Sequence, residues 1–159
     1  MDKTEILKEK LADAEVVLIG IGEEFNEKFD RIAEHEQLVK GLELVDAKEE
    51  LAWMVPYFEK IYLQEQNQSD ILSAYRNLYE LVKDKNYYIV TTCIDGLIQK
   101  AGFKPEKIVE PCGNYEKMQC SAKCSTKLYE SEEYANKIKE ALQDGTLEQV
   151  EQPVCPDCG

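Results

Sequence analysis

The hydrophobic pattern alternates between short apolar runs and long stretches with helical spacing. Continuous apolar runs at 15–20 (EVVLIG) and 87–92 (YYIVTT) predict two buried strands. A brief third strand is expected in KIVEP, at 107–111. Residues 3–13 and most of the segment 23–84 show the spacing of amphipathic helices. The order strand, helices, strand, helix, strand predicts a parallel α/β unit.

Two apolar stripes in the long helical segment predict helices that face a core. The first stripe consists of Leu51, Met54, Val55, Phe58, Ile61 and Tyr62, and the second of Ile71, Leu72, Tyr75, Leu78, Tyr79 and Val82. Breaks are expected near 41–46 and at 66–70, where Ser69 or Asp70 would be the N-cap of the next helix. Pro56 should either kink its helix or start it.

The sequence after Gly113 predicts a small module with two pairs of cysteines. NYEKMQCSAKC, at 114–124, predicts a short strand that runs into a cysteine knuckle. Residues 131–145 (SEEYANKIKEALQDG) predict a helix with Gly145 as its C-cap, and CPDCG follows as a second knuckle.

The net charge of the chain argues against some classes of binding partner. The formal net charge is -13, from 32 acidic and 19 basic residues, and such a field repels nucleic acids and anionic membranes. The amino-terminal sequence has no apolar core of a signal peptide, and the longest apolar stretch, VVLIGIG, is far shorter than the roughly 20 residues of a membrane span. We therefore expect a cytoplasmic protein, in which cysteines stay reduced and paired ones favour a metal over disulfides.

The cysteine spacing gives the strongest chemical signal. Cys120-x3-Cys124 and Cys155-x2-Cys158 place two thiols on each of two tight turns, which suits a tetrahedral zinc ion. Four sulfur ligands leave no open coordination position, so the predicted zinc is structural. Disulfides or free core cysteines are the alternatives. With this site, the sequence predicts a parallel α/β sheet with a helical insertion at about 25–85 and a small zinc-ribbon module.

The corresponding domains are an α/β domain at 1–112 and a zinc-binding module at 113–159. In the first domain, Gly20-x-Gly22 stands between a predicted strand and a predicted helix, so its backbone N–H groups could bind phosphates. Glu23 and Glu24 oppose this role, because they already satisfy the positive end of that helix and repel a pyrophosphate.

Four segments in order resemble the sirtuins, which are NAD-dependent protein deacylases and ADP-ribosyltransferases. LIGIGEE resembles their first glycine loop, TTCIDGLIQKAG their T-Q-N-[IV]-D-G-L-H-x-x-A-G loop and VEPCG their E-x-H-G segment, and the four cysteines follow. The resemblance spans about 15–159 and is greatest for the branch often linked to macrodomains.

The resemblance implies roles for single residues. Asp95 matches the aspartate that recognises the nicotinamide carboxamide, and Thr92 stands where the family usually has glutamine. Cys93 replaces the asparagine that orients the nicotinamide ribose, and Cys112 replaces the histidine that acts as general base. A thiol is a poor substitute for either group. The resemblance therefore predicts NAD contacts from the glycine loop, Thr92, Cys93 and Asp95, and it leaves the catalytic residues unassigned.

These observations predict a sirtuin-like NAD-dependent deacylase or ADP-ribosyltransferase, with structural zinc, that is weakly active or inactive alone. Its partners would be an acyl-lysine protein or an ADP-ribose acceptor. The alternatives are a non-catalytic zinc-ribbon interaction module or NAD/ADP-ribose-binding module, and an unrelated α/β protein with a zinc ribbon. In sirtuins the chain returns to the large domain after the second cysteine pair, whereas this sequence stops at Gly159. The resemblance therefore implies an incomplete Rossmann-like parallel sheet, in a partial Rossmann-like NAD-binding domain at 1–112. The open sheet edge beside the first strand would then favour self-association or a partner chain.

Overall fold

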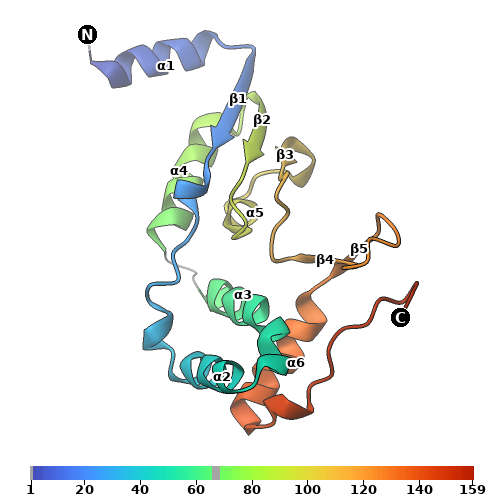
Figure 1. Ribbon diagram of the computed structural model, residues 1–159. Helices are drawn as coiled ribbons and strands as arrows, with labels where there is room; N and C mark the ends of the chain where they lie inside the picture. The colour runs from blue at the N-terminus through green and yellow to red at the C-terminus, as the bar shows by residue number, and fades with distance from the viewer. Residues whose placement is uncertain (1, 66–68) are drawn as a thin grey trace. The chain divides into compact units, whose positions relative to one another are not determined.

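The computed structural model describes residues 2–65 and 69–159, and the described residues form two compact units (Figure 1). Unit 1 comprises residues 2–26 and 69–113, and unit 2 comprises residues 27–65 and 114–159. Each unit has its own hydrophobic core. The sequence assigned the whole helical insertion to the first domain, whereas residues 27–65 lie in the same unit as the cysteine module. The domain division near residue 112 stays a prediction.

Unit 1 is built on a three-stranded parallel sheet. The strands are β1 (Val16–Ile21), β2 (Asn86–Thr91) and β3 (Ile108–Val109), in the order β1-β2-β3. Leu18 pairs with Tyr88, and Val90 pairs with Val109. The prediction of a parallel α/β unit with three strands is confirmed, and β1 is an edge strand of this sheet.

Two helices of unit 1 begin at Lys3 and Asp70, where the sequence predicts helix starts. The helices of this unit are α1 (Lys3–Asp13), α4 (Asp70–Val82) and α5 (Leu97–Lys100), with 3-10 helices at Glu23–Phe25 and Pro105–Lys107. Ser69 is the N-cap of α4, because its Oγ accepts the Leu72 N–H at 3.0 Å, as predicted. Residues 66–68 of the predicted break lie outside the described residues. Gly96, with φ of 67°, supplies the left-handed residue before α5.

The core of unit 1 lies on one face of the sheet. Tyr87, Ile89 and Thr91 of β2 are buried with side chains of α4 and α5. The alternate residues of β1 and β2, among them Leu18 and Tyr88, are exposed. The prediction of fully buried strands is therefore wrong for this face, because the described helices of unit 1 bury only the opposite one.

Unit 2 consists of helices and a hairpin. Its elements are α2 (Glu36–Ala47), α3 (Val55–Glu65), α6 (Glu132–Asp144), β4 (Lys117–Gln119) and β5 (Leu128–Glu130), with 3-10 helices at Ile32–Glu34, Glu49–Met54 and Leu147–Gln149. Strands β4 and β5 pair antiparallel, and the sequence predicted only the first. Pro56 is the second residue of α3 and therefore starts this helix. The predicted break near 41–46 is wrong, because α2 continues to Ala47.

The core of unit 2 joins α2, α3 and α6. Met54, Phe58, Tyr62 and Ile138 are almost completely buried in it. Gly145, with φ of 68°, is the C-cap of α6, as predicted. The first apolar stripe thus belongs to this core, whereas the second belongs to the core of unit 1.

Candidate metal centre and nucleotide loop

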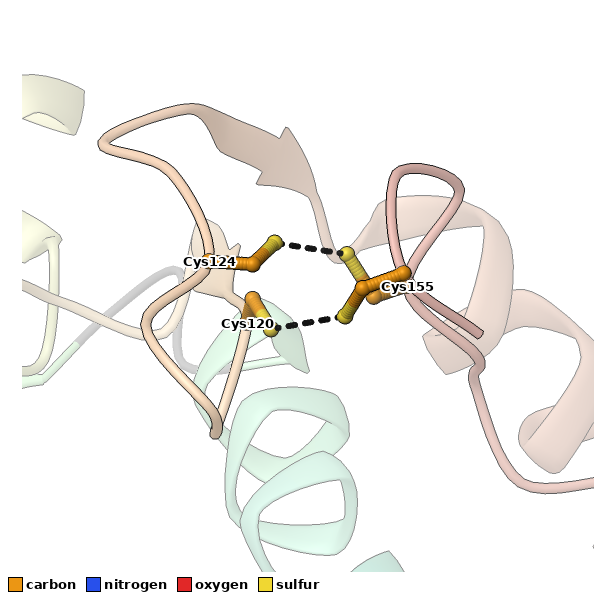
Figure 2. Close-up of side chains that lie close together, drawn as sticks. Cys120, Cys124 and Cys155 are labelled. Atoms are coloured by element: carbon orange, nitrogen blue, oxygen red, sulfur yellow. Dashed lines mark hydrogen bonds between the residues drawn. The ribbon is translucent and has the colours of Figure 1, made fainter.

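Four cysteine sulfurs of unit 2 lie within 4.8 Å of one another (Figure 2). The Cys120 and Cys158 sulfurs are 3.6 Å apart, and those of Cys124 and Cys155 are 3.5 Å apart. Ligands of a tetrahedral zinc ion, each about 2.3 Å from the metal, would be about 3.8 Å apart. The two predicted knuckles therefore bring together a donor set of the size and chemistry that zinc requires.

Backbone turns position the sulfurs. In the first knuckle, the Lys123 N–H donates to the Cys120 carbonyl at 3.0 Å, and Lys123 has a left-handed φ of 54°. In the second, the Gly159 N–H donates to the Cys155 carbonyl at 2.9 Å. Asp157 anchors this second turn to the β4–β5 hairpin, because its carboxylate accepts from the Lys127 Nζ at 2.9 Å and the Tyr129 hydroxyl at 3.1 Å.

The cysteine thiols of this cluster differ in pKa. The backbone N–H of Cys124, followed by its thiol, lowers the pKa of Cys120 to about 6. The hydrogen bond with Cys120 is the main cause that raises the pKa of Cys158 to about 12. Thiolates this close repel one another, so some of the thiols keep their protons unless a cation balances the charge. This electrostatic conflict is the one that a bound divalent metal would remove.

The second candidate site lies at the carboxyl ends of β1 and β2. Thr92 directly follows β2, and its N–H donates to the Ile21 carbonyl at 3.0 Å. The Cys93 thiol is buried and donates to the Gly22 carbonyl at 3.2 Å. The structure thus brings together the two loops that the sequence singled out. Ligands of open α/β sheets bind at this edge of the sheet.

The loop after β2 is held by buried polar contacts. The buried carboxylate of Asp95 accepts the Leu97 N–H at 3.0 Å, at the start of α5. The Ile94 N–H donates to the Asn26 Oδ1 at 2.8 Å. The sequence pattern does not indicate this role for Asn26, because Asn26 and Ile94 are far apart in the chain.

The glycine loop meets only part of the prediction. A Cβ atom at Gly20 or Gly22 would meet nothing within 4 Å, so there is room for a ligand beside the backbone. The predicted helix after Gly22 is instead the single 3-10 turn Glu23–Phe25. This turn is too short to present the dipole of an α-helix to a phosphate.

Tyr75 of α4 is a further polar group beside this loop. Its hydroxyl is buried and forms no hydrogen bond of ordinary geometry within the described residues. Burial, followed by the neighbouring Cys93 and Asp95, raises the pKa of Tyr75. Cys112, which the sequence resemblance aligns with the sirtuin histidine, is exposed after β3. The sequence pattern places Tyr75 in the second apolar stripe and indicates no role for it at this loop.

The sheet, the loops at its edge and the cysteine cluster define a Rossmann-like α/β protein with a candidate metal-binding module. The model of the Sir2 family matches residues 26–159, so this chain belongs to the Sir2 family. The predicted relationship to the sirtuins and the predicted fold class are confirmed. None of the described helices is both long and apolar enough to cross a membrane.

Two comparisons give the extent of the similarity. A protein of Staphylococcus aureus (strain Mu50 / ATCC 700699), named protein ADP-ribosyltransferase, is 25% identical to this chain over 174 residues. That match covers 98% of this chain but only 54% of the relative, so the chain spans about half the relative's length. A solved structure described as "Structural Basis for the Mechanism and Regulation of Sir2 Enzymes" has a TM-score of 0.53 and 20% identity, over 100% of this chain and 59% of that one. This second similarity supports the fold.

Proposed function

We propose that this chain is an NAD-linked, transferase-type module of the Sir2 family that binds NAD or ADP-ribose weakly and has little or no turnover alone. One observation carries the proposal. The buried Cys93 thiol is directed at the Gly22 carbonyl, beside a retained and buried Asp95. The loop therefore keeps the predicted carboxamide-binding group, whereas the group expected to orient a ribose is bonded within the protein.

Asp95 and the backbone at Gly20 and Gly22 would hold the nucleotide, and the cofactor would supply the ADP-ribosyl group. The name of the S. aureus relative supports this transferase class. The acceptor would be an acyl-lysine protein or another ADP-ribose acceptor. Thr92 and Cys93 complete the proposed cofactor contacts, but Cys93 has only a weakly bonding thiol to offer. Cys112 offers a thiol where the resemblance implies an imidazole base, so fast turnover is not expected.

The four cysteines would bind one structural zinc ion. Their sulfur distances support this assignment, and a four-sulfur site has no open position for catalysis. In a module with a short hairpin, metal binding would supply on the order of 10 kcal/mol of folding free energy. The zinc would therefore stabilise the module and take no part in group transfer.

Calorimetric titration of the zinc-loaded chain with NAD and with ADP-ribose tests the proposal. We expect weak binding of both ligands, in the range of about 0.1 to 1 mM. Asp95→Asn should weaken the binding of NAD but not that of ADP-ribose, because only NAD carries the carboxamide. Asp84→Asn, at an exposed carboxylate after α4, is the matched control and should change neither. The absence of heat with both ligands at millimolar concentration would refute the nucleotide-binding proposal.

The alternative is a non-catalytic zinc-ribbon module that binds no nucleotide. The acidic 3-10 turn Glu23–Phe25, which replaces the predicted helix, favours it, because Glu23 and Glu24 repel a pyrophosphate. Both proposals include a zinc ion, and metal analysis of the purified chain tests this shared part. One zinc per chain with no nucleotide heat supports the alternative, and well under one zinc per chain removes the metal site from both.

A further inference from the structure

The four sulfurs of the candidate metal centre come from two segments that are far apart in the chain. Cys120 and Cys124 belong to the first knuckle, whereas Cys155 lies 31 positions beyond Cys124 (Figure 2). Closing so long a loop costs conformational entropy, so the metal ion binds more tightly where another contact already joins the two segments. The structure shows such a contact beside the sulfurs.

One carboxylate connects the second knuckle to the hairpin that follows the first. Asp157 lies between the second pair of cysteines, and both of its oxygens accept from the Lys127 Nζ at 2.9 Å. Its Oδ2 also accepts from the Tyr129 hydroxyl at 3.1 Å and from the Ser125 Oγ at 3.3 Å. We call Ser125, Lys127, Tyr129 and Asp157 the clasp. Its three donors follow Cys124 closely in the chain, so the clasp joins the two segments that supply the sulfurs.

The aspartate of the clasp also contacts a proposed metal ligand. The backbone N–H of Asp157 forms a hydrogen bond with the Cys155 sulfur, while its side chain is bound to the hairpin. A carboxylate next to Cys158 in the chain would otherwise be able to approach a cation held by the sulfurs. The three donors of the clasp engage its oxygens. The donor set therefore remains four sulfurs, which favours zinc over the hard cations magnesium and calcium.

The charges of the clasp also act on the cluster. Four thiolates around one divalent ion leave an excess of negative charge, and the Asp157 carboxylate adds to it. Lys127 offsets this carboxylate, because its ammonium group lies against both oxygens. An exposed ion pair alone contributes little, but here three donors share one carboxylate beside a strongly negative cluster. Loss of the Lys127 charge should therefore disturb the loaded cluster more than loss of the Asp157 charge.

We propose that the clasp is the positioning element of the metal site. Asp157 holds the second knuckle against the hairpin, and Lys127 balances the negative charge of the loaded cluster. The clasp thereby slows the release of zinc without contacting the ion. The inference rests on the structural zinc of the proposed function, and it adds the residues that retain the metal.

The rate of zinc release from the full 159-residue chain tests the proposal. The zinc-loaded protein is mixed with an excess of a chelating indicator at low salt, and the colour change is followed with time. Lys127→Gln should release zinc about tenfold faster, at the lower end of the effect on metal affinity that supporting residues have. Asp157→Asn should release it only about threefold faster, because this change breaks the ion pair but also removes a negative charge.

Three comparisons separate the charge of the clasp from a general effect on folding. Lys127→Arg should stay within about twofold of the unchanged chain, because a guanidinium group pairs with a carboxylate through two parallel hydrogen bonds. Lys117→Gln is the matched control, since it removes the ion pair with Glu130 within the hairpin itself, and it should also stay within about twofold. In about 1 M salt the difference between Lys127→Gln and Asp157→Asn should shrink, because salt screens exposed charges.

The outcomes that would overturn the proposal are distinct. If the unchanged chain binds no zinc, both the clasp and the proposed metal site are wrong. If zinc is bound but Lys127→Gln releases it no faster than the unchanged chain, the clasp alone is refuted. Equal acceleration by Lys117→Gln would show that the stability of the hairpin, and not the clasp, retains the metal. Equal rates for Lys127→Gln and Asp157→Asn at low salt would contradict the role of charge.

Discussion

Single residues near the nucleotide loop show how much a polar group depends on its neighbours. The Tyr75 hydroxyl is buried beside Cys93, which already donates to the Gly22 carbonyl. A thiol is a weak hydrogen-bonding partner, so it compensates little for the lost hydration of a hydroxyl. A buried hydroxyl without a good partner destabilises the folded state by about 1 to 3 kcal/mol.

Tyr75→Phe should therefore stabilise the chain, by about 1 kcal/mol, because it removes this hydroxyl and leaves the ring in place. Urea unfolding followed by circular dichroism measures the change. Tyr88→Phe, at an exposed ring of the same unit, should be neutral within about 0.5 kcal/mol. A loss of stability in Tyr75→Phe would show that the hydroxyl has a strong partner in solution.

Some site residues could be predicted from sequence because their signals are local. The two cysteine pairs, the Ser69 cap and Asp95 before a short helix depend on spacing within a few residues. Asn26 and Tyr75 reach the loop from distant segments, and only the packing of the fold brings them there. Sequence patterns contain no information on such long-range contacts.

At the scale of elements, Gly41 explains why a predicted break is absent. Glycine suggested the end of a helix, but Gly41 lies inside α2 and is buried. A Cβ at this position would lie 2.7 Å from the Leu142 Cδ2 of α6 and 3.0 Å from the Phe58 Cζ of α3. The glycine therefore lies where side chains of α3 and α6 closely approach the backbone of α2, which the local sequence does not reveal.

Gly41→Ala should destabilise unit 2 by about 1 to 3 kcal/mol, because the new methyl group overpacks the core. This cost exceeds the roughly 1 kcal/mol by which alanine favours a helix. Glu43→Ala, at an exposed position of the same helix, should change stability by less than about 0.5 kcal/mol. Thermal unfolding of the two variants gives the comparison, and a stabilised Gly41→Ala would contradict the packing argument.

A buried lysine links three elements of unit 2. Lys60 of α3 is 2% exposed, and its Nζ lies 2.6 Å from the Glu116 Oε2, 2.9 Å from the Ser131 Oγ and 3.3 Å from the Glu132 Oε2. Both carboxylates reach solvent, whereas the ammonium group does not. The consequences of removing the acid and the base should therefore be unequal.

Glu116→Ala should destabilise the protein by about 2 to 4 kcal/mol, because the buried Lys60 charge loses its nearest partner. Lys60→Met should cost only about 1 kcal/mol, because the released carboxylates are solvated and the methionine fills the same space. Urea unfolding of both single variants and the double variant measures the difference. Equal costs, or a larger cost for Lys60→Met, would contradict this asymmetry.

The apolar stripes predicted which helical residues are buried but not which core they join. Phe58 and Tyr75 have the same helical spacing of apolar neighbours, yet they lie in different units. Similarly, the strand pattern predicted β1 and β2 but not the uncovered face, since their apolar residues occupy both faces of the sheet. Burial by a partner and burial by the same chain give the same sequence pattern.

At the scale of the whole molecule, the two units have separate cores and different requirements for stability. In unit 2, the cysteine module has a hairpin of two three-residue strands and segments of turns and irregular chain at 120–127 and 150–158, and few of these residues are buried. Unit 1 contains Cys93 and Cys112 but no group of metal ligands among its described residues. The proposed zinc should therefore stabilise unit 2 alone.

Removal of zinc with a chelator should increase hydrogen exchange in the cysteine module and α6, because metal binding there supplies folding free energy. Exchange at β2 and α4 should change little, because the core of unit 1 contains no proposed ligand. Cys124→Ser should reproduce the effect of chelation, whereas Cys112→Ser, at an exposed cysteine outside the cluster, should retain one zinc per chain. Uniform loss of protection in both units would instead show that the metal stabilises the molecule as a single cooperative body.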